Sequence, residues 1–244
     1  MCRMIAAIGD LDPARLAAAL KEMAANRNPA HTHEKRALGE AYRHDDGWGA
    51  AWVDGDTLRV RHSIHSCLED PLFDEVHDFE TDLLVLHARR ASRPGTVSLE
   101  NTHPFLVEYD GRPWAFCHNG TIHNIGQLRP AMGLVPAGSM DSELLFHHVL
   151  NHLEGADLER SLVASLDRID DYTALMMFLA NTDAVFATAK RHPNKGLREY
   201  HALWEGRGPR LRVVASEPLD GIGCTSWKRV PDSSVVTLKR GIPL

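Results

Sequence analysis

The chain opens with the nonapeptide MCRMIAAIG, residues 1–9, in which Met4–Ile8 is a short apolar run closed by Gly9. Such a run predicts a strand that is covered on both faces. Cys2 stands directly before this strand, and the initiator methionine is normally removed ahead of a small residue, which would leave Cys2 with a thiol and a free α-amine. An α-amine has a pKa of about 7.7–8.0 and can act as the base for its own side chain. The alternative is structural, because a small, weakly polar side chain also suits the start of a buried strand.

The composition is that of an ordinary globular protein, with 43% hydrophobic and 25% charged residues among 244. The net charge of −6, without any basic run, argues against nucleic acid as a partner. The apolar runs are too short to span a bilayer, and nothing resembles a secretory signal. The four cysteines are widely spaced and form no CxxC pair. They indicate reduced thiols, so we expect a cytoplasmic protein with no membrane partner.

Fifteen histidines raise the question of a metal site. The pair His148 and His152 is the best candidate, because residues four apart share one face of a helix. No HExxH motif and no cysteine partner accompany the pair. The sequence therefore predicts neither a metal nor any other cofactor.

Turn signals and apolar runs predict three antiparallel hairpins, which turn at Asp54-Gly55, Asp110-Gly111 and residues 181–183. Apolar periodicity predicts helices over 13–25, 141–153 and 157–169, with Asp141 or Ser142 near the N-terminal cap of the second helix. Apolar runs predict further strands over 82–87, 198–204, 211–216 and 234–238. Residues 26–44 are polar and predict a long loop. Periodicity alone indicates an α+β protein with one domain over residues 1–244, and two sheets covered by helices suit this pattern.

The segment 86–91 ends a predicted buried strand with two adjacent arginines, Arg89 and Arg90. Side chains alternate across a strand, so one of the two should point inward. A buried guanidinium offers a rigid fork of donors that suits a carboxylate. The plainer interpretation is a strand end that meets solvent.

Three more segments carry polar residues that a core does not require: 101–105, 117–120 and 139–143. In the second, the Asn119 side chain beside the Gly120 amide forms a two-donor arrangement that suits an oxyanion, although Asn-Gly is also a common turn. In the third, Asp141 could bind a ligand ammonium or simply cap a helix. A papain-like pairing of Cys117 with His118 is excluded, because neighbours on a strand project to opposite faces.

Together with Cys2, these segments resemble the class II glutamine amidotransferases, which are N-terminal-nucleophile hydrolases that take ammonia from glutamine. The matching motifs occur in order: the cysteine at position 2, H-x-R-x-A at 87–91, N-x-H-P at 101–104, H-N-G at 118–120 and D-[ST]-E at 141–143. Segments 45–50 and 215–219 also resemble the small stand-alone branch of that family. The resemblance implies a four-layer αββα sandwich.

The resemblance also implies roles for individual residues. Cys2 would be the nucleophile and its α-amine the base, while Asn119 and Gly120 would stabilise the tetrahedral oxyanion. Arg89 would bind the α-carboxylate of glutamine and Asp141 its α-ammonium. A sixth residue, His103, matches a family histidine beside the site. Arg90 departs from the Trp that some members carry there.

Three functions remain open at this point. The first is a glutaminase that passes ammonia to a separate synthase subunit, since we expect no attached synthase domain. The second is a hydrolase that acts on another γ-glutamyl metabolite, as the ergothioneine-pathway member of this branch does. The third, a non-catalytic binding domain, is disfavoured because the implied catalytic residues are all present. We predict that the loop 26–44 and the region around Arg90 determine which leaving group the enzyme accepts.

Overall fold

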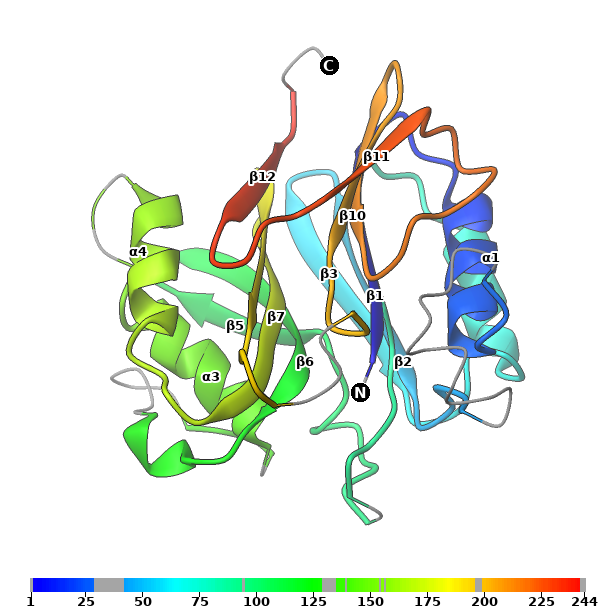
Figure 1. The fold of residues 1–244 in the computed structure, drawn as a ribbon. Helices are drawn as coiled ribbons and strands as arrows, with labels where there is room; N and C mark the ends of the chain where they lie inside the picture. The colour runs from blue at the N-terminus through cyan, green and yellow to red at the C-terminus, as the bar shows by residue number, and fades with distance from the viewer. Residues whose placement is uncertain are drawn as a thin grey trace.

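The structure is a computed structural model that describes residues 2–28, 42–93, 95–128, 135–138, 140–153, 155, 157–195 and 199–241. Its strands form two antiparallel sheets. The seven-stranded sheet has the order β11-β9-β10-β1-β4-β2-β3, and the five-stranded sheet has the order β12-β8-β7-β6-β5. The two sheets lie face to face in the middle of the molecule (Figure 1).

The seven-stranded sheet is built from both ends of the chain. Its members are β1 (Arg3–Gly9), β2 (Trp48–Asp54), β3 (Thr57–Ser63), β4 (Leu83–Ala88), β9 (Trp204–Arg207), β10 (Leu211–Ala215) and β11 (Ser226–Arg229). The first strand is central, between β4 and β10. The helix α1 (Pro13–Ala24) and the 3-10 helix η1 (Pro71–Asp78) pack on the outer face of this sheet.

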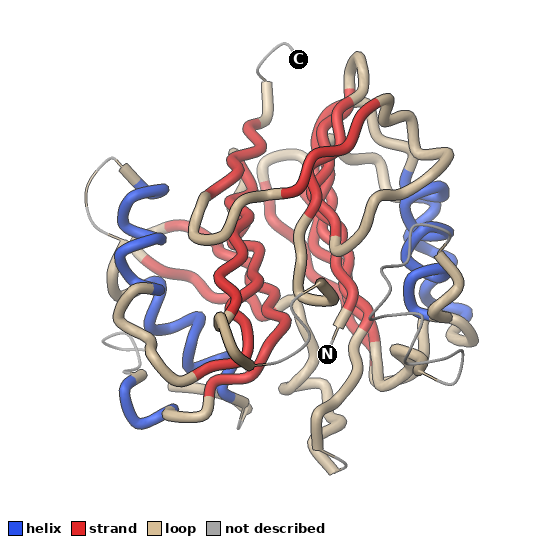
Figure 2. Tube along the Cα trace, viewed as in Figure 1, coloured by secondary structure: helices blue, strands red, loops and turns tan. Residues whose placement is uncertain are grey.

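The five-stranded sheet comes from the middle of the chain and its last strand. Its members are β5 (Phe105–Tyr109), β6 (Arg112–Ile122), β7 (Tyr172–Ala180), β8 (Ala184–Arg191) and β12 (Val235–Lys239). A short 3-10 helix, η2 (Ile125–Gln127), follows β6. The helices α3 (Asp141–Leu150) and α4 (Leu158–Leu166) cover its outer face. Figure 2 shows the resulting order of layers, with strands in the centre and helices on both outer sides.

Side-chain alternation assigns each residue to a layer. On β1, Met4, Ala6 and Ile8 face the second sheet, whereas Ile5 and Ala7 face α1. Cys117 on β6 and Phe178 on β7 meet the first group from the other sheet. We call this cluster between the sheets the inter-sheet core. The α+β class and the four-layer αββα sandwich are confirmed.

Helix α1 illustrates how local sequence fixes an element. The side chain of Asp12 accepts a hydrogen bond from the Arg15 amide at 3.1 Å, and Pro13 follows at the first helical position. Leu16, Leu20 and Met23 then form the buried face. Within the described ranges, no helix is both long and apolar enough to cross a membrane.

The three hairpins form where the turn signals predicted them, but other elements differ. Residues 199–203 are turn and loop, so the strand expected over 198–204 is wrong, and β9 begins only at Trp204. The reason is that Tyr200 is buried as an anchor, with its hydroxyl oxygen 2.5 Å from the His44 ring. Helix α3 ends at Leu150, and η1 and β11 were not predicted.

Candidate active site

Four polar side chains enter the end of the inter-sheet core because of strand parity. Cys2 continues the inward face of β1 that Met4 occupies. On β4, His87 and Arg89 continue the inward face of Val85, and on β6 Asn119 continues that of Cys117. The start of β1 belongs to the seven-stranded sheet and meets β6 of the other sheet, so residues from both sheets come together there.

Cys2 and Asn119 are joined by two hydrogen bonds across the sheets. The Cys2 backbone nitrogen donates to Asn119 Oδ1 at 2.8 Å, and Asn119 Nδ2 donates to the Cys2 carbonyl at 3.1 Å. Because a backbone N–H can only donate, this pairing fixes which way the side-chain amide points. Asn119 Nδ2 also donates to the Met176 sulfur, with 3.8 Å between nitrogen and sulfur. A thioether sulfur is a weak acceptor.

The Cys2 thiol differs electrostatically from the other three cysteines. Burial alone raises the pKa of Cys2, but the charges of His87 and of the chain's N-terminus outweigh it and lower the pKa to about 6. Burial raises the pKa of Cys67 to about 12 and that of Cys224 to about 11. Burial also holds the pKa of Cys117 well above its ordinary value. Cys2 is therefore the cysteine that is a thiolate near neutral pH.

Gly120 lies at a bulge in β6. The register with β7 shifts between Gly120 and Ile122, and Gly120 has a φ of 152°. A Cβ on Gly120 would lie 1.8 Å from the Ala174 carbonyl oxygen, so no larger residue fits. The Thr121 amide bonds to the Thr173 hydroxyl at 3.0 Å instead of a ladder carbonyl. Bulges of this kind redirect backbone and side chains beside active sites.

The two arginines that follow β4 point to different places, as alternation predicted. Arg89 is 2% exposed, and its Nη2 donates to the Thr96 carbonyl at 2.9 Å. Arg90 is half-buried, lies 4.0 Å over the Tyr42 ring and donates to the Arg43 carbonyl at 2.6 Å. The Arg90 carbonyl faces the Cys2 thiol, with 3.9 Å between oxygen and sulfur.

Asp141 lies at the first residue of α3 but does not cap it. The N-cap residue is Met140, which makes no side-chain cap, so Asp141 and Ser142 lie next to the cap, where the sequence predicted one of them. The Asp141 carboxylate instead accepts from the Ile122 amide at 2.7 Å and the Ser142 amide at 2.9 Å. It thereby ties α3 to the bulge of β6.

Two buried histidine rings lie against each other, tilted by 50°, at the edge of this group. The rings of His87 and His103 lie 4.6 Å apart, and the side chains are 0% and 4% exposed. His118 lies on the other face of β6, where its Nδ1 is 2.9 Å from the Ser142 hydroxyl. The site thus brings together Cys2, Asn119, Arg89 and the His87–His103 pair. His87 was not predicted, although a polar residue at the end of an apolar strand was a usable signal.

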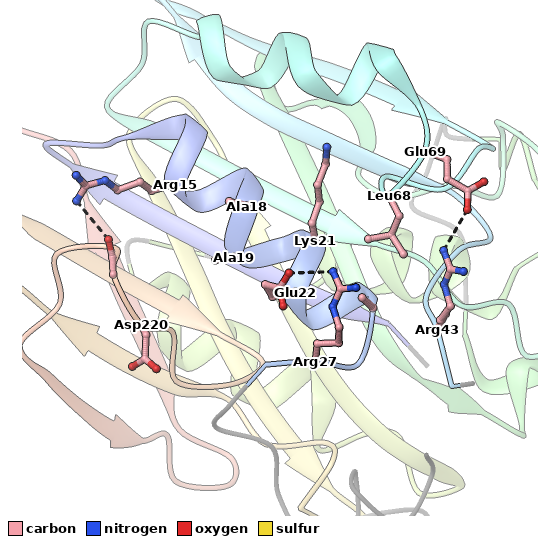
Figure 3. Close-up of a pocket in the computed structure, with 12 residues that line it drawn as sticks. Arg15, Ala18, Ala19, Lys21, Glu22, Arg27, Arg43, Leu68, Glu69 and Asp220 are labelled. Carbon is pink, nitrogen blue, oxygen red and sulfur yellow. Dashed lines mark hydrogen bonds and ion pairs between the residues drawn. The ribbon is translucent and has the colours of Figure 1, made fainter. Parts of the chain in front are cut away.

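A conspicuous hollow lies elsewhere on the surface. It has a volume of about 730 Å³ and lies over α1, with Arg15, Lys21 and Asp220 in its wall (Figure 3). The six predicted site residues are not among those that line it. Two ion pairs form within its wall, Arg27 with Glu22 at 3.0 Å and Arg43 with Glu69 at 3.2 Å. We therefore assign the chemistry to the Cys2 group and not to this hollow.

A buried ionic cluster fixes the residue after Cys2. Arg3 is 0% exposed, and its guanidinium lies 3.5 Å from the Tyr200 ring centroid and 3.9 Å from the Glu217 carboxylate. Asn28 donates to the other oxygen of Glu217 at 2.7 Å. Burial lowers the pKa of Arg3 to about 10, against the opposing effect of Glu217. The cluster therefore anchors the start of β1 through a paired charge.

Replacing Glu217 by glutamine should reduce the free energy of unfolding by roughly 3–5 kcal/mol, because Arg3 would stay buried without its counter-charge. Glu22→Gln, which breaks the exposed pair with Arg27, should cost less than about 1 kcal/mol. Urea unfolding of both variants measures the difference. Equal losses would mean that the buried pair contributes no more than an exposed one.

The structure also bears on the histidine pair that the sequence suggested for a metal. The His148 Nε2 lies 3.1 Å from the Ser165 carbonyl, and the His152 Nδ1 lies 2.7 Å from the His148 carbonyl. Each imidazole ring therefore forms a hydrogen bond with a backbone carbonyl. Among the described residues, no group of three or more His, Cys, Asp or Glu side chains is arranged to hold a metal ion.

The fold is that of the N-terminal-nucleophile hydrolases. A sequence profile described as glutamine amidotransferases class-II matches residues 23–243. The chain is 33% identical over 233 residues to a putative glutamine amidotransferase of Haemophilus influenzae, covering 85% of this chain and 78% of that one. It is 36% identical over 112 residues to the putative glutamine amidotransferase YafJ of Escherichia coli, covering 45% and 43%. The chain belongs to the class II glutamine amidotransferases.

Solved structures agree on the fold. The glutamine phosphoribosylpyrophosphate amidotransferase of B. subtilis, complexed with ADP and GMP, matches with a TM-score of 0.68 and 17% identity. The match covers 98% of this chain and 49% of that one, so this chain spans about half of that enzyme. A class-II domain protein from Silicibacter pomeroyi matches with a TM-score of 0.61 and 17% identity, over 98% and 99% of the two chains. The family makes the protein an enzyme, and glutamine amide hydrolysis its general reaction.

Proposed function

We propose that this protein hydrolyses the side-chain amide of glutamine through a γ-glutamyl thioester on Cys2. The single observation that carries the proposal is the Cys2–Asn119 pair, held by bonds of 2.8 and 3.1 Å beside a thiol whose pKa is lowered to about 6. Family membership supports glutamine as the substrate class. We further propose that residues 1–244 act as one glutaminase domain.

Removal of Met1 precedes catalysis and frees the α-amine of Cys2. The thiolate attacks the carboxamide carbon, and the α-amine carries the proton. The developing oxyanion is stabilised by Asn119 Nδ2, which has a weakly bonded hydrogen toward Met176, and by the amide of Gly120 at the bulge. Ammonia then leaves, and water hydrolyses the thioester to give glutamate and the free thiol.

Arg89 and Asp141 bind the amino-acid end of the substrate in this proposal. Arg89 is buried and fixed by Thr96, so its remaining donors are held in one orientation. Asp141 is held by two backbone amides and is half-buried. A carboxylate has about four lone-pair sites, so it can accept an ammonium as well.

Arg89→Lys and Asp141→Asn should each raise the KM for glutamine by about tenfold or more, the loss expected for one charge-assisted hydrogen bond of roughly 1.5–3 kcal/mol. Arg93→Lys and Asp45→Asn are the matched controls, since both residues are exposed, and they should leave KM unchanged. Steady-state glutamate release measures all four. If Arg89→Lys and Asp141→Asn bind glutamine like their controls, this binding pocket is assigned incorrectly.

A γ-glutamyl compound other than glutamine is the second candidate substrate. The observation that favours it is Arg90, which is stacked on Tyr42 with its carbonyl at the Cys2 thiol. Because the Arg90 carbonyl meets the thiol, its guanidinium lies close enough to suit a leaving group that carries a carboxylate. The predicted role of loop 26–44 stays a prediction, because residues 29–41 lie outside the described residues.

Incubation of the processed enzyme with glutamine and with a panel of γ-glutamyl amides tests the proposal. Glutamate release from glutamine with the highest kcat/KM supports the glutaminase function, and a higher kcat/KM for another amide supports the second candidate. Coupled amidation in the presence of a separate synthase subunit would identify the ammonia acceptor. If no γ-glutamyl compound yields glutamate, the proposed function is wrong.

A further inference from the structure

His87 is a fully buried side chain that interacts with the reacting sulfur of Cys2. His87 on β4 lies opposite Met4 on β1. Cys2 is two residues before Met4, so its side chain lies on the same inward face, next to His87. His87 is 0% exposed, and neither of its ring nitrogens forms an ordinary hydrogen bond with a residue that the structure describes. Buried polar groups are seldom left unpaired without a functional reason.

The His103 ring can approach His87 because Gly49 has no side chain. In the sheet, Gly49 on β2 lies between His87 on β4 and His62 on β3. A Cβ on Gly49 would lie 2.1 Å from the His103 carbonyl, so only glycine allows this approach. The His103 ring therefore lies on the His87 ring, and its own nitrogens are also unpaired among the described residues.

The surroundings determine which ring can carry a proton. Burial, followed by the charges of His87, His118, Arg89 and His62, lowers the pKa of His103 well below its ordinary value, so His103 is neutral. Burial lowers the pKa of His118 as well, against the opposing effect of Asp141. The titratable groups that interact electrostatically with His87 are the Cys2 thiol, His103 and His118, and His62 lies two strands away on the same sheet face. The thiol is the group among them that can give His87 a proton.

We propose that His87, shielded by neutral His103, takes the proton of the Cys2 thiol and holds the resting enzyme as a thiolate–imidazolium pair. The S–H bond breaks and an N–H bond forms on His87. When the thiolate has formed a C–S bond with the substrate and the C–N bond breaks, that proton passes from His87 through the α-amine of Cys2 to the nitrogen, which leaves as ammonia. The later attack of water on the thioester returns one proton to sulfur and leaves the other on the product carboxyl group. The turnover step rests on the proposed function, but the ion pair exists without substrate.

The test is the rate of Cys2 alkylation by iodoacetamide as a function of pH, measured by mass on the 2–9 peptide. In the parent protein the midpoint should lie near pH 6. In His87→Gln it should rise toward the ordinary thiol value of about 8.5. At pH 6.5 the rate should fall about fivefold, because the loss of thiolate is partly offset by the higher nucleophilicity of a more basic sulfur. His62→Gln, on the same sheet face, is the control and should keep the parent's midpoint.

A His87→Gln protein that is folded by circular dichroism and keeps the parent's midpoint would overturn the proposal. A second measurement needs no substitution at His87. In parent protein with ¹⁵N-labelled histidine, one imidazole should lose its charge when Cys2 is alkylated, and the absence of any such ring would also overturn it. Neither measurement uses glutamine, so a failure of the glutaminase function and a failure of the ion pair are separate results.

Discussion

Replacement of Cys2 by alanine is expected to lower the rate of glutamine hydrolysis by at least about 10⁴-fold, the scale of loss when a nucleophile is removed. Alanine is as suitable as cysteine for removal of the initiator methionine, so the α-amine is kept and only the sulfur is lost. The oxyanion donors and the amino-acid binding residues also remain. The loss should therefore appear in kcat, while glutamine still binds.

Cys224→Ala is the matched control for this variant. Cys224 is half-buried, far from the site in sequence, and burial raises its pKa to about 11. Its replacement should leave kcat unchanged. Hydrolysis by Cys2→Ala within tenfold of the parent rate would show that another group is the nucleophile. Ammonia and glutamate must be measured together, since a true amide hydrolysis releases them in equal amounts.

Asn119→Ala is expected to lower kcat by about 10²–10³-fold, the typical effect of removing one oxyanion donor. The same side chain also holds the Cys2 backbone at 2.8 Å, so alanine removes a positioning contact as well. Asn119→Asp separates the two effects. A carboxylate still accepts from the Cys2 nitrogen but has no N–H to donate to an oxyanion.

Both Asn119 variants should therefore lose kcat if the donor matters for the transition state. Asn181→Ala is a suitable control, because Asn181 is also buried and its side chain also bonds to backbone, at the amides of Asp183 and Ala184. It lies at the β7–β8 turn and should affect stability but not kcat. If Asn119→Asp retains the parent's kcat, Asn119 only positions Cys2.

Much of the fold followed from local signals. The Asp-Gly turns and the Asp12 cap act between neighbours in the chain, so their sequence is sufficient to predict them. Alternation along β4 predicted that one of Arg89 and Arg90 points inward, and the structure shows that it is Arg89. By contrast, the loop at 199–203 depends on Tyr200, whose hydroxyl bonds to His44 and whose ring receives Arg3. No pattern within those residues reveals such distant partners.

Cys2 and Asn119 lie together as the sequence led us to expect, but the contacts of the predicted residues did not follow from the sequence. Asn119 was expected where a strand ends, whereas β6 continues to Ile122 and only a bulge interrupts it. For Asp141 the sequence left ammonium binding and helix capping open, and it did not reveal that the carboxylate accepts from a strand amide. His87 was missed because its significance depends on Cys2 and His103, which come from other elements. Hydrogen bonds between the sheets depend on the tertiary structure, so the sequence indicates which residue types are present but not which of them bond to each other.

The most direct test of a Cys2 nucleophile is the mass of the protein after reaction with a glutamine analogue that carries a chloroketone in place of the amide. We predict one adduct per chain, on the peptide of residues 2–9, in a protein from which Met1 is absent. Glutamine in excess should protect against it. An adduct on Cys67, Cys117 or Cys224, or full reaction and activity in a protein that retains Met1, would contradict the account.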